Sequence, residues 1–514
     1  MLKNIVSSYL GSYARRRVRE IRDTYAHPLR LQEKALFSVL DKARYTEFGR
    51  TYDFKSIKSI EAYQCRVPLF RYKDMRSWIA RAIKGNVNVI WPGRIWNFAL
   101  TSGTTSGDKY IPVSKDAIAA NKRAAMDCLS FYLTEGDKGS VLDGKFLFLG
   151  GSTSLKRLKS GAFAGDLSGI VARTAPKALR SIYEPGKKIA LLPDWEEKIE
   201  RIVRKDVDED IRGIAGIASW VIVFFNKLLQ EASRRKGKKV ETVAEIWPNL
   251  SFFIHGGISF APYREVIGRM IGRDVHYLEI YPASEAFIAI QDRKDAEGLL
   301  LMVDNENFYE FVPEEEIDSE KPPRLTVADV QTGKNYAIVV TNNSGLYSYV
   351  LGDTVRFVDL DPLRLVVTGR ITNFLSAFGE HLIIEEAEDA IAYACERTDA
   401  MIEEYTVAPF FQSNPAKLPY HQWLIEFKKE PAIMDEFIGY IDRRLREKNA
   451  DYDTHRGRDI SIGRPRVTVL RKGTFYDWME SEGKLGGQHK VPRLKNDRSI
   501  AERLLAVGSN EGEA

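Results

Sequence analysis

The stretch Ser251–Ile280 decides the fold class, and it reads SFFIHGGISFAPYREVIGRMIGRDVHYLEI. It begins with a short apolar run that is typical of a strand and that ends at His255-Gly256-Gly257. The residues Tyr263–Ile271 then have the pattern of a helix, and Val275–Ile280 is again typical of a strand. Because a strand, a helix and a strand follow one another, we expect a parallel β-α-β unit and an α/β fold.

The same alternation extends outward from this stretch in both directions. Strands are predicted at Ile90–Leu100, at Lys145–Leu149 and at several short runs within 299–360, which we interpret as a smaller β subdomain. Helices are predicted at these stretches: 1–50, Ser114–Leu133, Trp195–Val203, Ile211–Leu229 and Ile384–Glu396. We therefore expect a large N-terminal domain with parallel-rich sheets at residues 1–369, and a small, mobile α+β lid domain at 370–514.

Composition and charge exclude several classes of protein. Of the 514 residues, 44% are apolar and 29% are charged, which excludes a disordered, collagen-like or rod-like chain. The formal net charge is only +5, so nucleic acid is not an expected partner. The three cysteines, Cys65, Cys128 and Cys395, form no C-x-x-C pair, which predicts a reducing, cytoplasmic location without disulfides or a cysteine-based zinc site.

Two segments bear on membranes. The longest uncharged apolar run, Gly213–Phe225, is shorter than the roughly 20 residues of a spanning helix, and we interpret it as a buried helix. Apolar residues within Leu2–Tyr13 fall at helical spacing and precede Arg15-Arg16-Arg17, without the continuous apolar run of a secretory signal. This segment fits a membrane-surface helix or, as we prefer, a helix that packs against its own protein.

A polar loop carries the first chemical signal. Residues 101–109 hold five hydroxyls, two glycines and a lysine, in the order Thr101, Ser102, Gly103, Thr104, Thr105, Ser106, Gly107, Asp108 and Lys109. Glycines let a backbone approach a ligand closely, and amide and hydroxyl groups can donate to phosphate oxygens. A helix after the loop would add its positive N-terminal end. The spacing does not fit a Walker loop, so a different phosphate-binding loop and a plain surface loop remain the alternatives.

Two further segments place acidic residues after strands. Glu279–Glu285 reads EIYPASE, in which Tyr281 can stack on a nucleobase and Glu285 is a hard oxygen ligand suited to Mg²⁺. An ordinary strand end capped by Ser284 fits this segment equally well. Gly345–Asp353 reads GLYSYVLGD, and its terminal aspartate can either accept hydrogen bonds from a ribose diol or stabilise a turn.

Taken in their order, these segments resemble those of the adenylate-forming superfamily, which includes acyl-CoA synthetases, luciferases and peptide-synthetase adenylation domains. Within it, the chain is most similar to the Gretchen Hagen family of auxin-responsive acyl acid–amido synthetases, and it is identified as a bacterial-type member. The resemblance extends from Thr46-Glu47-Phe48-Gly49-Arg50 to Lys490-Val491-Pro492-Arg493.

The resemblance implies that ATP and Mg²⁺ are bound. The loop Thr101–Lys109 would hold the β- and γ-phosphates, Tyr281 would lie on adenine, and Asp353 would hold the ribose hydroxyls. Ser284 would belong to the same nucleotide site, and Glu285 would bind Mg²⁺.

The resemblance also implies two catalytic residues and an acyl site. Lys490 would bridge the substrate carboxylate and the α-phosphate, and Arg370, at the hinge between the domains, would reach ribose or phosphate. His255, Gly256 and Gly257 would wall the acyl site, and Trp220 would belong to a helix that lines it.

The function expected on this basis is an AMP-forming ligase. It would activate a carboxylic acid as an acyl adenylate, release pyrophosphate and transfer the acyl group to the amine of an amino acid. One alternative is a ligase that passes the acyl group to coenzyme A or another thiol, and a second is a non-catalytic nucleotide-binding or membrane-surface protein. We expect a monomer without stable membrane insertion. Five apolar residues fit either an acyl pocket or core packing: Trp220, Val221, Phe224, Phe225 and Phe260.

Overall fold

The computed structural model divides the chain into two compact units. One unit comprises the residues up to 101 and from 109 to 371, and the other the residues from 374 onward. The structure describes residues 2–101, 109–135, 143–150, 155–174, 183–192, 194–258, 260–294, 296–371, 374–380, 382–412, 417–457, 461–481 and 491–509. Whether the second unit moves as a lid stays a prediction.

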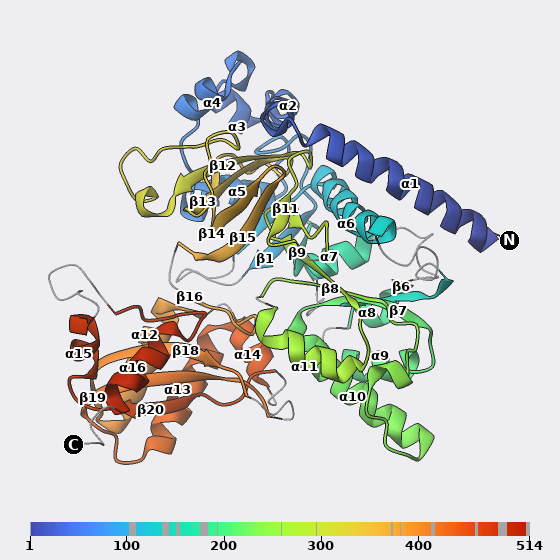
Figure 1. Cartoon of the computed structure of the whole chain (residues 1–514). Coiled ribbons are helices and arrows are strands. Elements are labelled where there is room, and N and C mark those ends of the chain that lie inside the picture. Colours follow the sequence, from blue (N-terminus) through green and yellow to red (C-terminus); the bar gives the residue numbers. More distant parts are fainter. Residues whose placement is uncertain are drawn as a thin grey trace. The chain divides into compact units, whose positions relative to one another are not determined.

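Helices form the first segment of the large unit, as the sequence predicts. They are α1 (Leu2–Thr24), α2 (Pro28–Ala43), α3 (Glu47–Thr51), α4 (Ile60–Arg66) and α5 (Tyr72–Ile83). α1 lies along α6 (Lys115–Glu135), with Val18 and Ile21 buried (Figure 1). This part of α1 therefore packs against its own protein. The expectation for Leu2–Tyr13 stays a prediction, because the side chains of residues 2–9 lie outside the described ones. None of the described helices is long and apolar enough to span a bilayer.

The polar loop connects two antiparallel strands. β1 (Asn97–Thr101) and β2 (Lys109–Val113) pair so that Thr101 lies opposite Lys109. With β5 (Phe163–Gly165) and β4 (Lys156–Arg157) they form a sheet in the order β2-β1-β5-β4. A five-residue strand thus separates the loop from α6, and the Oγ of Ser114 accepts a hydrogen bond from the Ala117 N–H at the start of that helix. Residues 102–108 lie outside the described part of the chain, so the expectation that this helix adds its N-terminal charge to the loop stays a prediction.

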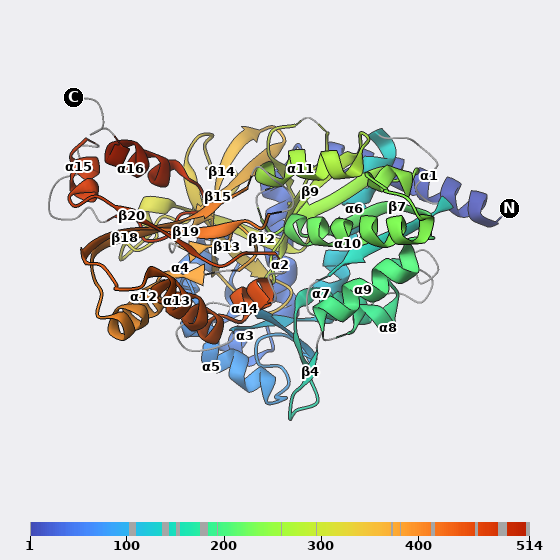
Figure 2. The ribbon, with the colours of Figure 1, turned by 90° about the horizontal axis from the view of Figure 1, so that it is seen from below.

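The parallel sheet predicted from Ser251–Ile280 is present. β8 (Phe252–Gly256), α11 (Ala261–Ile271) and β9 (His276–Pro282) form the expected β-α-β unit. β9, β8, β7 (Ile211–Gly216), β3 (Lys145–Leu149) and β6 (Tyr183–Glu184) are parallel neighbours in that order. The helices of this part are α7 (Leu167–Thr174), α8 (Lys187–Ala190), α9 (Trp195–Asp206) and α10 (Ala218–Lys236), and α9 and α10 pack side by side (Figure 2).

The predicted helix over Ile211–Leu229 is wrong in its first part. Residues 211–216 form β7, and α10 begins only at Ala218. β7 pairs with β3 and β8, and glycine is needed at position 213 because a Cβ atom there would lie 2.1 Å from the ring of Phe252 on the neighbouring strand. The apolar run Gly213–Phe225 is therefore a buried strand followed by a buried helix, and periodicity alone does not distinguish the two in a short apolar run.

The strands within 299–360 continue the same sheet instead of forming one of their own. Among the described residues, the full order is β12-β13-β14-β15-β11-β10-β9-β8-β7-β3-β6. The antiparallel members are β10 (Phe287–Ile290), β11 (Leu299–Leu301), β12 (Asn307–Pro313), β13 (Asn335–Asn342), β14 (Tyr349–Leu360) and β15 (Leu363–Arg370). β9, β14 and β15, which carry candidate site residues, are therefore members of one sheet.

The second unit is α+β, as predicted. A three-stranded sheet, in the order β18-β19-β20, is formed by β18 (Met401–Phe410), β19 (Tyr420–Lys429) and β20 (Arg466–Leu470). α12 (Ile384–Thr398) and α13 (Met434–Lys448) pack against each other, as Figure 2 shows. The remaining elements are β16 (Phe374–Leu375), β17 (Leu382–Ile383), α14 (Ala450–Arg456), α15 (Thr474–Ser481) and α16 (Ser499–Ser509).

Candidate nucleotide and acyl site

Asp353 is the centre of the candidate site. It lies on β14 opposite Arg370 on β15, and the Nε of Arg370 donates to its Oδ1 at 2.5 Å. The hydroxyl of Tyr281, at the end of β9, donates to its Oδ2 at 2.5 Å. Each carboxylate oxygen keeps a second lone pair, so Asp353 can still accept hydrogen bonds from a ligand.

Two further charges from distant parts of the sequence act on this centre. Lys109 begins β2 and Glu285 follows β9, and both side chains are half-buried. Burial lowers the pKa of Lys109, while the negative charges of Glu285 and Asp353 oppose that effect. Burial also raises the pKa of Glu285, and Asp353 raises it further, while Arg370 and Lys109 lower it. The structure therefore brings together Lys109, Glu285, Asp353 and Arg370, which share one electrostatic environment.

The turn after β9 holds Glu285 in place. The Ala283 N–H donates to the Ala286 carbonyl at 2.8 Å, and the half-buried Ser284 lies within this turn. The Nδ2 of Asn342 donates to the Glu285 carbonyl at 2.7 Å and so ties the turn to the end of β13. Sequence reasoning missed Asn342, although it lies only three residues before the Gly345–Asp353 segment.

Two tyrosines beside the charged cluster were also missed. Burial raises the pKa of Tyr349 well above its usual value, and the negative charge of Glu285 adds to the effect. The ammonium of Lys109 lies 5.9 Å from the ring centre of Tyr72, whose hydroxyl accepts a hydrogen bond from the Tyr110 N–H at 2.9 Å. Tyr349 lies within a segment that the sequence singles out, whereas nothing in the sequence marks Tyr72.

Some of the expected site residues lie outside the described part of the chain. Thr101 is described as the last residue of β1, but Ser102, Gly103, Thr104, Thr105, Ser106 and Gly107 are outside it. Lys490 is outside it as well. The roles predicted for these residues stay predictions.

The segment His255-Gly256-Gly257 lies at the end of β8, beside the end of β9. A Cβ atom on Gly256 would lie 2.2 Å from the Ile280 carbonyl oxygen, and Gly257 has a φ of +85°, so glycine is needed at both positions. His255 is 3% exposed and stacks on Phe260 with ring centres 3.8 Å apart. Burial lowers its pKa to about 3, so the imidazole is neutral at pH 7. Its Nδ1 makes no hydrogen bond to the described residues, which leaves a polar atom at the expected acyl site.

Four of the apolar residues for which the sequence left open an acyl pocket or core packing are buried: Val221, Phe224, Phe225 and Phe260. Val221, Phe224 and Phe225 are fully enclosed on α10, and Phe224 stacks on Trp247 with ring centres 6.0 Å apart. Trp220 is half-buried on the same helix. Core packing therefore explains the three enclosed residues, and the role of Trp220 at an acyl site stays a prediction.

The charges of the cluster suit a magnesium nucleotide. Glu285 and Asp353 balance Lys109 and Arg370, so the four groups carry no formal net charge. In the described part of the chain, no group of three or more histidine, cysteine, aspartate or glutamate side chains could hold a metal ion. Mg²⁺ is usually held by one or two carboxylates together with substrate phosphates, so Glu285 fits an ion that is bound together with a nucleotide.

The fold of the chain matches that of adenylate-forming enzymes. The structure of the acyl acid amido synthetase GH3.15 superimposes with a TM-score of 0.59 at 18% identity, covering 93% of each chain. The structure of 2-hydroxyisobutyryl-CoA ligase with 2-HIB-AMP and CoA superimposes with a TM-score of 0.56 at 14% identity, covering 92% of this chain and 91% of the other. At these identities the likeness concerns the fold.

Family comparison then identifies the chain. The GH3 family N-terminal domain matches residues 17–185 and 154–275, the central domain residues 300–370, and the C-terminal domain residues 385–499. The chain belongs to the GH3 family, which confirms the resemblance seen in the sequence.

Curated relatives span nearly the whole chain. The indole-3-acetic acid-amido synthetase GH3.3 of Arabidopsis thaliana is 23% identical and covers 92% of this chain and 90% of its own length. The jasmonoyl-L-amino acid synthetase JAR4 of Nicotiana attenuata is 24% identical and covers 93% of this chain and 92% of its own.

Proposed function

We propose that this protein joins a carboxylic acid to the amine of an amino acid through an acyl adenylate, with ATP as the source of AMP. The observation that carries the proposal is the grouping of Lys109, Glu285, Asp353 and Arg370, which come from separate segments and act on one another electrostatically. Membership of the GH3 family and the names of the relatives, which are amido synthetases, support the choice of reaction.

The side chains of the site suit the parts of a nucleotide. Asp353 would accept hydrogen bonds from the ribose hydroxyls, and Tyr281, whose hydroxyl donates to that carboxylate, would lie against the base. Lys109 and the hydroxyl-rich loop before it would face the phosphates. Glu285 would hold Mg²⁺, which when bound supplies positive charge to the phosphate oxygens.

The reaction needs little from the protein beyond charge and placement. The substrate carboxylate attacks the α-phosphate and pyrophosphate leaves, so two anions must approach each other. Arg370 and Lys490 would stabilise the charge that develops there. A buried, neutral His255 would offer an uncharged polar atom to the acyl group instead of a third cation.

Incubation of the full chain with ATP, Mg²⁺, a panel of carboxylic acids and either amino acids or coenzyme A tests the proposal. We expect carboxylate-dependent exchange of labelled pyrophosphate into ATP, and an amide product in mass spectra. A thioester without an amide would instead identify an acyl-CoA ligase, and exchange that no carboxylate stimulates would contradict both reactions. The amino acid acceptor, the monomeric state and the cytoplasmic location stay predictions.

Lys490→Ala tests the catalytic part of the proposal separately from nucleotide binding. Loss of one such electrostatic contact should lower the exchange rate by about 10²- to 10³-fold, while the affinity for ATP changes little because Asp353 and Tyr281 remain. Exchange near the wild-type rate in this variant would remove Lys490 from the mechanism. Lys495→Ala, a nearby lysine without an assigned role, is the matched control.

A further inference from the structure

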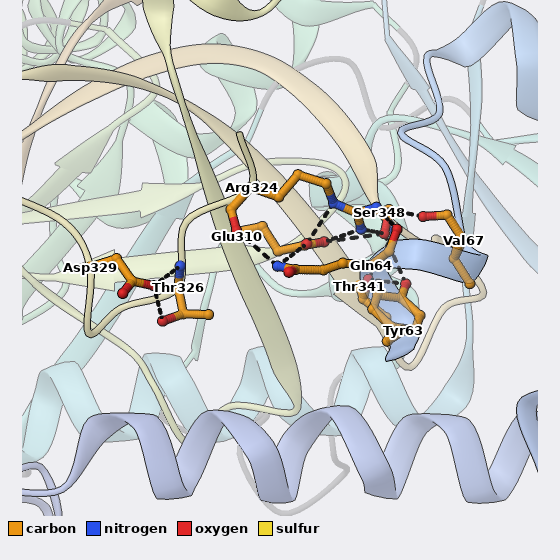
Figure 3. Close-up of polar contacts among 9 residues, drawn as sticks. All are labelled: Tyr63, Gln64, Val67, Glu310, Arg324, Thr326, Asp329, Thr341 and Ser348. Carbon is orange, nitrogen blue, oxygen red and sulfur yellow. Dashed lines mark hydrogen bonds and ion pairs between the residues drawn. The ribbon is translucent and has the colours of Figure 1, made fainter. Parts of the chain in front are cut away.

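Arg324, whose side chain is 10% exposed, contacts Ser348, the residue directly before the strand that carries Asp353. All five N–H groups of Arg324 donate hydrogen bonds, a complete use of the guanidinium (Figure 3). Two N–H groups bind the carboxylate of Glu310 on β12, at 2.8 and 2.9 Å. Two others bind the carbonyl oxygens of Gln64 and Val67, at 2.7 and 2.6 Å, and the fifth binds the Oγ of Ser348 at 2.6 Å.

These contacts join segments that are far apart in the sequence. Gln64 and Val67 form the end of α4, where free carbonyl oxygens favour a cation. The Nε2 of Gln64 also donates to Glu310 at 3.0 Å, so the helix end and β12 are held by the same pair of charges. We call Arg324, Glu310, Gln64, Val67 and Ser348 the Arg324 clamp.

Ser348 is the residue of the clamp that needs to be held. Its φ is +40°, in a region that residues other than glycine rarely adopt. Its Oγ binds Arg324 and also lies 3.1 Å from both Glu310 and the hydroxyl of Tyr63. Its N–H donates to the Oγ1 of Thr341 at 2.9 Å. Every polar contact of this side chain is made inside the fold, so the buried network stabilises a backbone conformation that would otherwise be unfavourable.

The clamp sets the position of the strand that follows. β14 begins at Tyr349, directly after Ser348, and Asp353 is its fifth residue. Phe70 binds the backbone on both sides of Tyr349, because its N–H donates to the Ser348 carbonyl and its carbonyl accepts from the Val350 N–H, each at 2.9 Å. A shift of Ser348 would therefore be transmitted along β14 to Tyr349 and Asp353.

We propose that Arg324 is a positioning residue for nucleotide recognition, which fixes Ser348 and through it the place of the Asp353 carboxylate that selects for a ribose. The proposal rests on the proposed function, in that Asp353 takes the ribose hydroxyls. Arg324 itself does not touch the nucleotide. Lysine cannot replace it, because an ammonium has three donors and lacks the planar fork that Glu310 receives.

The test measures the ratio of the dissociation constants of 2′-deoxyATP and ATP by titration calorimetry with Mg²⁺ present. This ratio needs no knowledge of the acyl substrate, and loss of stability alone does not change it in the folded fraction. Wild type should prefer ATP by about tenfold or more, the worth of a hydrogen bond to a charged group. In Arg324→Met, the ratio of the two dissociation constants should fall to about one, within about twofold. Arg324→Lys replaces this variant in the test if Arg324→Met does not fold, and the same result is expected.

Two further variants separate the possible failures. Arg17→Met removes an arginine whose side chain is equally exposed, 10%. Its partners are Asp127 and Asp304, so this variant should keep the wild-type ratio. Asp353→Asn should lose the preference for ATP over 2′-deoxyATP. If this variant keeps the wild-type preference, or if wild type itself has none, both the ribose role of Asp353 and the positioning role of Arg324 are overturned. A preference lost in Asp353→Asn but kept in the Arg324 variants would overturn the positioning role alone.

Discussion

Arg17 and Arg324 are buried to the same extent but hold different parts of the molecule. Each arginine side chain is 10% exposed, and each is paired with a carboxylate that is 0% exposed, Asp127 for Arg17 and Glu310 for Arg324. Arg17 binds Asp127 through two hydrogen bonds of 2.9 Å and Asp304 through one of 2.8 Å, and so fastens α1 to α6. Arg324 instead binds one carboxylate, two backbone carbonyls and a hydroxyl, next to the strand of Asp353.

The two arginines differ in which part of the molecule a change in their contacts would displace. Carboxylates on α6 and before β12 hold a helix on the surface of the large unit, so the Arg17 contacts contribute to stability. The contacts of Arg324 end on a strained backbone residue, five positions before a residue of the candidate site. Both arginines are therefore expected to contribute to stability, but only the contacts of Arg324 are expected to affect the candidate site.

The largest effect is expected when each arginine loses its most buried carboxylate. Glu310→Ala leaves Arg324 without an anion and should lower the free energy of unfolding by about 3–5 kcal/mol. Asp127→Ala should lower it less, because Asp304 still binds Arg17. Urea unfolding followed by circular dichroism measures both, and an Asp127 variant that is less stable than the Glu310 variant would contradict this order.

An intermediate effect is expected for a buried acid that has no arginine. Asp206, at the end of α9, is fully buried, and neither of its carboxylate oxygens has a hydrogen-bond partner among the described residues. Burial raises its pKa to about 7, with Glu184 and Glu209 adding to the shift and Lys205 and Lys145 opposing it. Because the folded protein binds this proton more tightly than the unfolded chain, stability is lost as the pH rises from about 4 to about 7.

Asp206→Asn should therefore be more stable than wild type at pH 8, by about 2–4 kcal/mol, and equal to it near pH 4. Urea unfolding at a series of pH values gives the difference directly. Asp210→Asn, whose carboxylate is bound by Arg212, is the matched control and should show no gain at pH 8. A gain that is constant across the series would show that the carboxylate of Asp206 does not titrate as inferred.

The smallest effects are expected from removing one hydroxyl from each network. Tyr25→Phe removes a hydrogen bond of 2.7 Å to Asp304, and Ser348→Ala removes the 2.6 Å bond from Arg324. Each should lower stability by about 1–2 kcal/mol. The Ser348 variant should also lose a few-fold of the preference for ATP over 2′-deoxyATP, whereas the Tyr25 variant should keep it. The same ratio in both variants would remove the functional distinction between the two networks.

Much of the fold could be predicted from local pattern. The strand–helix–strand stretch Ser251–Ile280 folds as expected, because apolar spacing and glycine punctuation act over a few residues. The predicted helix at Ile211–Leu229 failed in its first part, because a short apolar run buried on both faces has the same composition as a strand or as a helix. Pairing with β3 and β8 makes the segment a strand, and these neighbours come from other parts of the sequence.

The candidate site divides in the same way. The sequence singled out Tyr281, Glu285 and Asp353 because their segments follow predicted strands, whereas Arg370 came only from the resemblance to a known family. It gave no sign of Asn342, Tyr72 or Arg324, since an arginine in an ordinary-looking stretch has no local pattern that reveals its partners.

The amino-acid order by itself determined which turns carry charge, which chemical groups are available and which segments are strands or helices where the local pattern is clear, as in Ser251–Ile280 but not in 211–216. Tertiary structure alone decided that these groups meet: three strands lie between β14 and β9 in the sheet, yet the hydroxyl of Tyr281 lies 2.5 Å from Oδ2 of Asp353. It also decided that one buried arginine fastens a helix while another holds a strained turn. The physical reason is that hydrogen bonds and charges act over a few ångströms, whereas residues 17 and 127, or 324 and 64, are separated by long stretches of chain.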